Sequence, residues 1–314
     1  MTRIRVMRPW RRGVRLVVAF GIVSGGPLTA RGQGGNVKYA PLAAQLPTSV
    51  RAAGMGGAWT SGRDADAVFY NPANAGANGI IVGGGRFGSA GTFGHASNGL
   101  SFGATGISLG VAWLDYGAAP GPGVPWRSLA ARGADDGFSA LAVAAASMTF
   151  KGIRWGAAAK LLEERIANSH DGIAAFDFGA AKEFGPYSTG VAVQNVAGSI
   201  DVRGVPMYAP TRFTLGASGG GRPVGPVDLG ASVAVAVRRD GFVAPAGGFE
   251  VSYTPLDGYL FALRIGAHRP EAEAVNPFTA GASMGLDRFT LDYAFADLRA
   301  PGRGAVHSVG IRVR

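Results

Sequence analysis

Long stretches of the chain alternate between large apolar residues and small or polar ones. In residues 288–296, phenylalanine, leucine and tyrosine occupy alternate positions, with threonine, aspartate and alanine between them. The same two-residue period recurs in residues 153–164, 211–219 and 259–268. Because successive side chains of a β-strand point to opposite faces, this period predicts strands with one large apolar face and one small or polar face.

Applied to the whole chain, the two-residue period predicts about fourteen strands. Their expected bounds are residues 79–88, 99–105, 107–116, 137–150, 153–164, 172–184, 187–197, 211–219, 227–238, 245–254, 259–268, 277–286, 288–296 and 305–314. The expected connections alternate in length, being long at 89–98, 117–136 and 198–210 and short near Gly106 and at 151–152. Short turns on one side and longer loops on the other are typical of a transmembrane β-barrel.

A soluble β-sandwich or lipocalin is the alternative fold for such strands. Its outward face would carry lysine, glutamate and threonine, whereas here the second face is mostly glycine and alanine. A soluble barrel of about fourteen strands would also enclose a lumen too wide for side chains to fill. The pattern therefore favours an all-β fold, a transmembrane antiparallel β-barrel over residues 79–314.

Composition and charge further restrict the class of protein. The chain has 52 Gly and no Cys, and charged residues make up 16% of it, against about 25% in soluble domains. The net charge is +10, but residues 1–32 hold seven Arg and no acid, which leaves 23 basic and 20 acidic residues elsewhere. We therefore predict no nucleic-acid partner. The missing cysteines exclude disulfides and thiolate metal sites, and no cofactor is predicted.

The N-terminal 32 residues have the organisation of a secretory signal peptide. An arginine-rich start is followed by an apolar stretch over 16–30 and then by Ala30-Arg31-Gly32, a small-x-small cleavage site. The apolar stretch contains Gly25, Gly26 and Pro27 and is too short and too interrupted for a transmembrane helix.

The segment RDADAVFYNPANA, residues 63–75, is the candidate site. Asp64 is expected to cap a short helix over Ala65–Phe69, and Asn71 to cap a second turn that has Pro72 at its first position. This predicts a helix-break-helix wedge before the first strand. The alternative is a catalytic aspartate pair, Asp64 and Asp66.

An enzyme, for example an outer-membrane hydrolase, is the competing functional class. The chain has four histidines, spread along its length without metal-ligand spacing: His95, His170, His268 and His307. No serine stands in a motif that marks it as activated, although spacing alone leaves a Ser-His or Asp-His pair open. The sequence predicts no catalytic, cofactor-binding or metal-binding residue.

Residues 50–58 (VRAAGMGGA) and 64–73 (DADAVFYNPA) resemble the N-terminal signature of the PorV/PorQ group of outer-membrane proteins. These proteins are relatives of the FadL long-chain fatty-acid transporters. The resemblance continues in residues 172–180, 191–196 and 289–295.

The resemblance implies a fourteen-stranded barrel whose residues 33–78 fold into the lumen as a hatch. The hatch motif would comprise Gly54, Gly56, Gly57, Asp64, Asp66, Tyr70, Asn71, Pro72 and Ala73. FadL-like members pass hydrophobic molecules, and PorV-like members act with the type IX secretion machinery. We expect an outer-membrane protein of a Gram-negative-type cell. Its expected function is passive transport of hydrophobic small molecules or, alternatively, a role as a secretion adaptor. The implied partners are outer-membrane lipid, a hydrophobic ligand and secretion-system proteins.

Overall fold

The computed structural model describes residues 39–87, 91–115, 137–166, 169–202, 204–270, 276–297 and 305–313. The chain divides into two units, Met1–Gln33 and Gly34–Arg314, and all the described residues belong to the second. The predicted signal peptide, residues 1–32, therefore lies outside the described residues and stays a prediction.

Four short helical elements precede the strands. They are η1 (Leu42–Ala44), α1 (Val50–Gly54), η2 (Ala65–Phe69) and η3 (Pro72–Asn74), of which α1 is α-helical and the others are 3-10 helices. The strands that follow are β1 (Gly79–Phe87), β2 (Gly91–Phe102), β3 (Thr105–Asp115), β4 (Gly137–Phe150), β5 (Ile153–Ile166), β6 (Ser169–Phe184), β7 (Tyr187–Val196), β8 (Ser199–Val202), β9 (Val205–Tyr208), β10 (Arg212–Val224), β11 (Val227–Arg238), β12 (Val243–Tyr253), β13 (Tyr259–His268), β14 (Phe278–Leu286), β15 (Phe289–Asp297) and β16 (Ala305–Val313).

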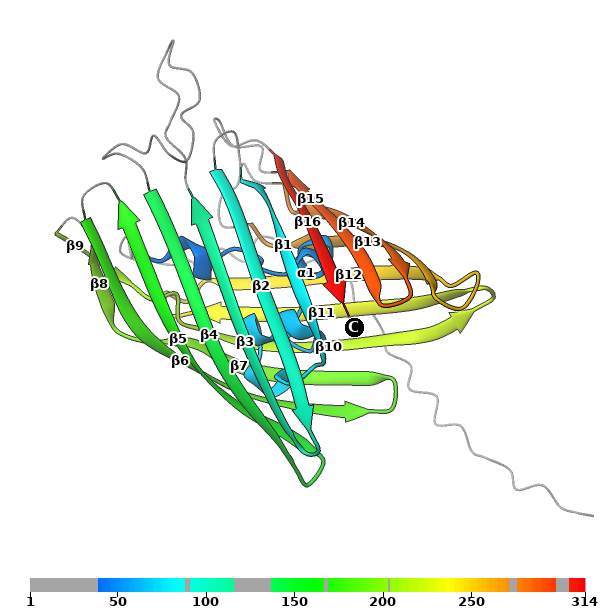
Figure 1. Ribbon diagram of the computed structural model, residues 1–314. Helices are drawn as coiled ribbons and strands as arrows, with labels where there is room; N and C mark the ends of the chain where they lie inside the picture. Colours follow the sequence, from blue (N-terminus) through cyan, green and yellow to red (C-terminus); the bar gives the residue numbers. More distant parts are fainter. Residues whose placement is uncertain are drawn as a thin grey trace, which may run out of the picture. The chain divides into compact units, whose positions relative to one another are not determined.

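Fourteen strands of the described chain close into one antiparallel barrel (Figure 1). Closure comes from β1, which pairs with β2 on one side and with β16 on the other. The strands β8 and β9 form a separate two-stranded sheet between β7 and β10 in the sequence. The predicted all-β barrel of about fourteen strands is thus confirmed.

The two faces of the wall differ as the alternation predicts. On β3 the large side chains Ile107, Leu109 and Val111 are about half exposed, whereas Ser108 and Ala112, which point to the other face, are buried. Many strand ends next to the short turns carry exposed aromatic residues, the arrangement of a membrane-interface girdle: Phe102, Phe150, Phe184, Tyr187, Tyr253, Tyr259 and Phe289. The outward face is therefore suited to hydrocarbon. Within the described residues, no helix has the length and apolar character needed to cross a membrane.

Four of the expected boundaries were wrong. Residues 91–98, expected in a long loop, belong to β2, and the turn near Gly106 lies instead at residues 103–104. The outward positions of this strand hold Gly94, Ala96 and Asn98, so its apolar alternation is weak. The predicted loop 198–210 contains the hairpin β8–β9. Strand β10 continues through residues 220–224, which lie between the expected strands 211–219 and 227–238.

The residues before β1, numbered 39–78 and called here the N-terminal segment, contact strands from several parts of the barrel. The helix α1 packs against β13 to β16, whereas η2 and η3 pack against β1 to β6. The contacts reach the buried, small or polar face of these strands, as at Gly83, where an added Cβ would lie 3.1 Å from Val50 Cγ2.

Candidate functional site

The Asn71-Pro72-Ala73 turn is held by hydrogen bonds at both ends of the Asn71 side chain. Asn71 Oδ1 accepts from the N–H of Ala73 at 3.0 Å, and Pro72 occupies the first position of η3. This confirms the predicted cap. Asn71 Nδ2 donates to the carbonyl oxygens of Thr60 at 3.0 Å and Ala180 at 3.3 Å. Asn71 is fully buried, so one side chain joins the turn to both the N-terminal segment and β6.

Glycines on three neighbouring strands make room for this turn. A Cβ added at Gly156 on β5 would overlap the carbonyl of Pro72, and one at Gly179 on β6 would overlap Asn71 Oδ1. At Gly190 on β7 it would lie 2.8 Å from Asn71 Nδ2. Because any larger residue would displace the turn, these glycines belong to the site. In the sequence, their only signal was a glycine at an inward position of each strand, which does not distinguish them from other strand glycines.

Asp64 lies at the N-cap position of η2, but its side chain does not cap the helix. The carboxylate instead accepts from Trp59 Nε1 at 3.0 Å and lies 3.9 Å from Arg312 Nη1. The predicted cap is therefore wrong, because the carboxylate accepts from the Trp59 indole and lies toward the positive charge of Arg312 instead. Burial and the neighbouring Asp66 raise the pKa of Asp64, and the positive charges of Arg312 and Arg51 offset only part of that rise.

Asp66 has the partner histidine that the sequence did not reveal. Its Oδ2 lies 3.3 Å from His95 Nε2, and its Oδ1 accepts from Ser97 Oγ at 2.7 Å. Both partners are on β2, the strand that the periodicity misplaced. The Ser97 hydroxyl donates to Asp66 and not to His95, so this group lacks the serine–histidine contact that activates a nucleophile. The arrangement instead fastens η2 to β2.

The remaining motif residues shape the backbone around α1 and η2. Tyr70 is buried, its hydroxyl accepts from the N–H of Ser49 at 3.2 Å, and burial raises its pKa. Gly56 has a positive φ of 69° and its N–H donates to Thr279 Oγ1 at 3.0 Å. Gly57 also has a positive φ, of 82°, and Gly54 packs against the backbone of β14 at Gly281. The motif glycines thus allow a tight turn to lie directly on β13 and β14.

An ionic network joins α1 to β12, β13, β15 and β16. Arg51 binds Glu250 with both Nε and Nη2, at 3.1 and 2.7 Å. Glu250 also accepts from Arg264, which in turn contacts Ser283 and Asp292, and Asp292 lies 3.4 Å from Arg312. Burial alone would lower the pKa of Arg51, but the negative charges of Glu250, Asp64 and Asp292, together with the hydrogen bond to Glu250, more than offset it, so the pKa is raised. Ion pairs therefore hold the side of the N-terminal segment that faces β12 to β16.

The opposite side of the N-terminal segment is held by apolar contacts. Val68 and Phe69 of η2 belong to one buried cluster with inward-facing residues of β3 to β6. These residues are Ala112, Leu141, Val143, Ala145, Ala158, Leu162 and Ala175. A Cβ at Gly110 would lie 2.7 Å from Phe69 Cζ, so the ring fits closely against β3. The inner wall therefore has an apolar region.

A β-bulge between β6 and β7 adds polar contacts that the sequence did not indicate. The register shifts between Phe176 and Phe178, and both Gln194 and Asn195 are buried there. Gln194 Nε2 donates to the carbonyl of Phe69 at 2.7 Å, and Asn195 Oδ1 accepts from Lys160 Nζ at 2.9 Å. A bulge turns two successive side chains inward where a regular strand would turn one.

Fold and site together define a membrane-type β-barrel with an apolar outer face and a mixed polar and apolar interior. Solved structures with this fold include the P. putida toluene transporter TodX, with a TM-score of 0.54, 10% identity, and coverage of 83% of this chain and 96% of that one. The Ralstonia pickettii toluene transporter TbuX gives a TM-score of 0.51 and 12% identity, covering 89% of this chain and 99% of that one. At these identities the likeness concerns the fold alone, a closed antiparallel β-barrel. No family model and no curated protein matches the sequence.

Proposed function

We propose that this protein is an outer-membrane β-barrel for passive transport of hydrophobic small molecules. In this proposal the N-terminal segment is a hatch inside the lumen, with Gly54, Gly56, Gly57, Asp64, Asp66, Tyr70, Asn71, Pro72 and Ala73 as its motif. The likeness of the fold to the toluene transporters TodX and TbuX supports it.

The observation that carries the proposal is the apolar region of the inner wall on β3 to β6. Barrels that conduct polar solutes have polar interiors, whereas here Leu141, Val143 and Leu162 form a buried apolar surface beneath Val68 and Phe69. If η2 moved away, this surface would be exposed to the lumen. A hydrophobic solute could then replace Val68 and Phe69 on the wall without exposing apolar surface to water.

The test is uptake of an apolar dye by cells that express the protein. We expect faster entry of N-phenyl-1-naphthylamine than in cells with an empty vector, and no change for the polar dye carboxyfluorescein. Ala175→Asn would place an amide on the apolar wall, and an unpaired amide there costs about 1–3 kcal/mol, so apolar-dye entry should fall roughly tenfold. The matched control is Ala294→Asn, an equally buried inward position on β15, away from the apolar cluster. Equal dye entry with and without the protein would refute the transport function.

Localisation is tested separately, because a barrel can assemble without transporting. The protein should fractionate with outer membranes and shift on gels when heated. Recovery in the soluble periplasm, or the absence of a heat-dependent shift, would refute the membrane assignment.

The second candidate function is a PorV-like adaptor role in type IX secretion. It rests on the resemblance of residues 50–58 and 64–73 to the PorV/PorQ signature. Cross-linking in the native cell should then recover secretion-system components together with this protein. Recovery of the barrel alone, combined with dye uptake, would decide for transport.

A further inference from the structure

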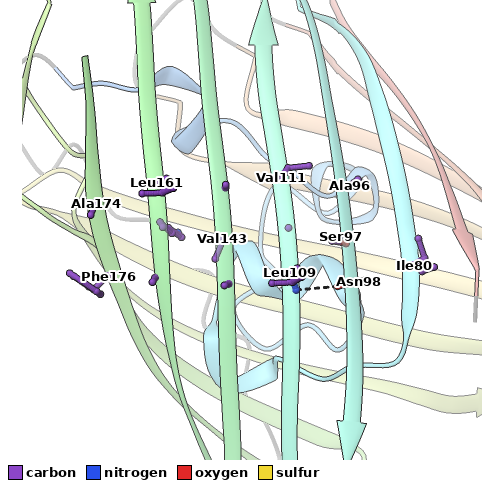
Figure 2. A pocket seen from close by; sticks show the side chains of 15 residues that line it. Ile80, Ala96, Ser97, Asn98, Leu109, Val111, Val143, Leu161, Ala174 and Phe176 are labelled. Carbon is purple, nitrogen blue, oxygen red and sulfur yellow. Dashed lines mark hydrogen bonds between the residues drawn. The ribbon is translucent and has the colours of Figure 1, made fainter. Parts of the chain in front are cut away.

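The outward face of β1 to β6 carries a groove of about 650 Å³, shown in Figure 2. Its sides are formed by Leu109 and Val111 on β3, Leu161 on β5 and Phe176 on β6. Its floor is formed by alanines. The register explains this shape, because Asn98, Leu109, Ala144, Ala159 and Phe176 are successive partners across five strands. The groove volume falls in the range of small-molecule pockets, roughly 300–1,000 Å³.

Asn98 brings a polar side chain to this apolar groove. Its Oδ1 accepts from the N–H of Leu109 at 3.2 Å, as the dashed line in Figure 2 shows. Because that partner is a donor, the amide orientation is fixed and Nδ2 points away from it. Among the described residues, Nδ2 donates no hydrogen bond. Phe249 on β12 and Leu263 on β13 illustrate what such outward positions hold elsewhere on the wall, namely large apolar side chains.

The depth of Asn98 limits what can accept from it. It lies four residues before Phe102, the girdle residue at the short turn, which for a tilted strand is roughly 10 Å into the hydrocarbon layer. Lipid tails offer no acceptor at that depth, and lipid ester groups lie near the headgroups. An amide left without a partner in hydrocarbon is strongly unfavourable.

We propose that this groove is a binding site for an apolar molecule dissolved in the bilayer that carries a carbonyl or ether oxygen. The oxygen accepts from Asn98 Nδ2, and the apolar body lies between Leu109, Val111, Leu161 and Phe176 on the alanine floor. The site is distinct from the proposed hatch, because its lining residues come from β1 to β6 and lie outside the N-terminal segment. Its ligand reaches it from the membrane.

The experiment uses the full-length protein in nanodiscs made of ether-linked lipids, which contain no ester carbonyl. The probe is the ketone 6-propionyl-2-dimethylaminonaphthalene, and the matched probe without an acceptor is 2-dimethylaminonaphthalene. Binding is read as saturable quenching of tryptophan fluorescence, for which Trp113 and Trp155 stand on the outward faces of β3 and β5. Asn98→Leu should weaken binding of the ketone about fivefold, the value of one hydrogen bond, and leave the matched probe unchanged.

A second pair of variants tests the groove without touching the amide. Ala159→Leu fills the floor and should weaken both probes about tenfold, whereas Ala282→Leu, at an outward alanine of β14, should change neither. Barrel assembly is checked for each variant by the heat-dependent gel shift. The proposal is overturned if Asn98→Leu changes ketone binding less than twofold, or if Ala282→Leu weakens binding as much as Ala159→Leu. Loss of ketone binding in ester-linked lipid would also overturn it, because the groove would then hold a lipid ester. Dye uptake plays no part here, so this test can fail while the transport function stands.

Discussion

Replacing Asn71 by alanine should loosen the N-terminal segment while leaving the barrel wall intact. The substitution removes the cap on η3 and the hydrogen bonds from Nδ2 to Thr60 and Ala180. A lost cap costs about 1 kcal/mol, and each lost hydrogen bond about 1 kcal/mol. Thr60 keeps one donor, since Asn74 Nδ2 also reaches its carbonyl at 3.2 Å. We therefore expect about 3 kcal/mol in total, which raises the displaced population roughly 100-fold.

The absence of native cysteine makes this population measurable. Ser61 is buried, and its Oγ makes no hydrogen bond to the described residues, so Ser61→Cys is a mild change. In that background, a thiol reagent should react roughly 100-fold faster when Asn71→Ala is added. Asn78→Ala is the matched control, because Asn78 contacts Ser101 on the exposed surface, and it should leave the rate unchanged.

Two results would contradict this reasoning. A rate increase below threefold in an assembled barrel would show that Asn71 does not hold the segment. Failure of Asn71→Ala to reach the membrane, with Asn78→Ala assembling normally, would show that the turn serves folding and not docking. The heat-dependent gel shift distinguishes the two.

Three further changes test other anchors of the segment. Gly179→Ala adds a methyl group that overlaps Asn71 Oδ1. In the Ser61→Cys background it should therefore raise the rate of reaction with the thiol reagent about as much as Asn71→Ala does. An unchanged rate would mean that the turn adapts to the added methyl group. Glu250→Gln leaves the Arg51 and Arg264 guanidiniums without their shared carboxylate. The free energy of unfolding should fall by about 3 kcal/mol, which is measured as a lower urea midpoint of unfolding. A midpoint equal to that of the wild type would exclude the ionic anchor. Asp64 has a raised pKa, so the stability that its protonated form contributes is complete below pH 3.8 and is lost as the pH rises through the raised pKa. Asp64→Asn should therefore gain in melting temperature over wild type at neutral pH and lose that gain in acid, whereas a pH-independent difference would contradict the burial argument.

The fold was predictable where a strand's outward face is uniformly apolar. Residues 289–297 form β15 almost as expected because phenylalanine, leucine and tyrosine occupy the outward positions from 289 to 295. The prediction was wrong at β2, where Gly94, Ala96 and Asn98 face outward and give no apolar period. The apolar period exists only where a face carries large apolar side chains, so a strand whose outward face holds small or polar residues gives no signal.

The site was predictable only where its contacts are local. The Asn71 cap joins residues two apart and follows from the Asn-Pro sequence. The contacts of Asp66 with His95 and of Arg51 with Glu250 join elements that meet only when the barrel closes. Asp64 shows the same limit, since its local role as a cap loses to Trp59 and to the distant Arg312.

The unequal anchoring of the N-terminal segment indicates where its displacement would begin under the proposed transport function. On the β12 to β16 side, displacement would separate Arg51 from Glu250 and Asp64 from Arg312, and the loss of such ion pairs is unfavourable. On the β3 to β6 side, Val68 and Phe69 contact only apolar surface over much of their area, and an apolar solute offers that surface an equivalent contact. A hydrophobic molecule therefore competes with Val68 and Phe69 and not with α1, and η2 moves only when the contacts of Asp66 with His95 and Ser97 also break. The ionic side would remain attached, so the segment would move as a hinged flap and return to its place once the solute has left.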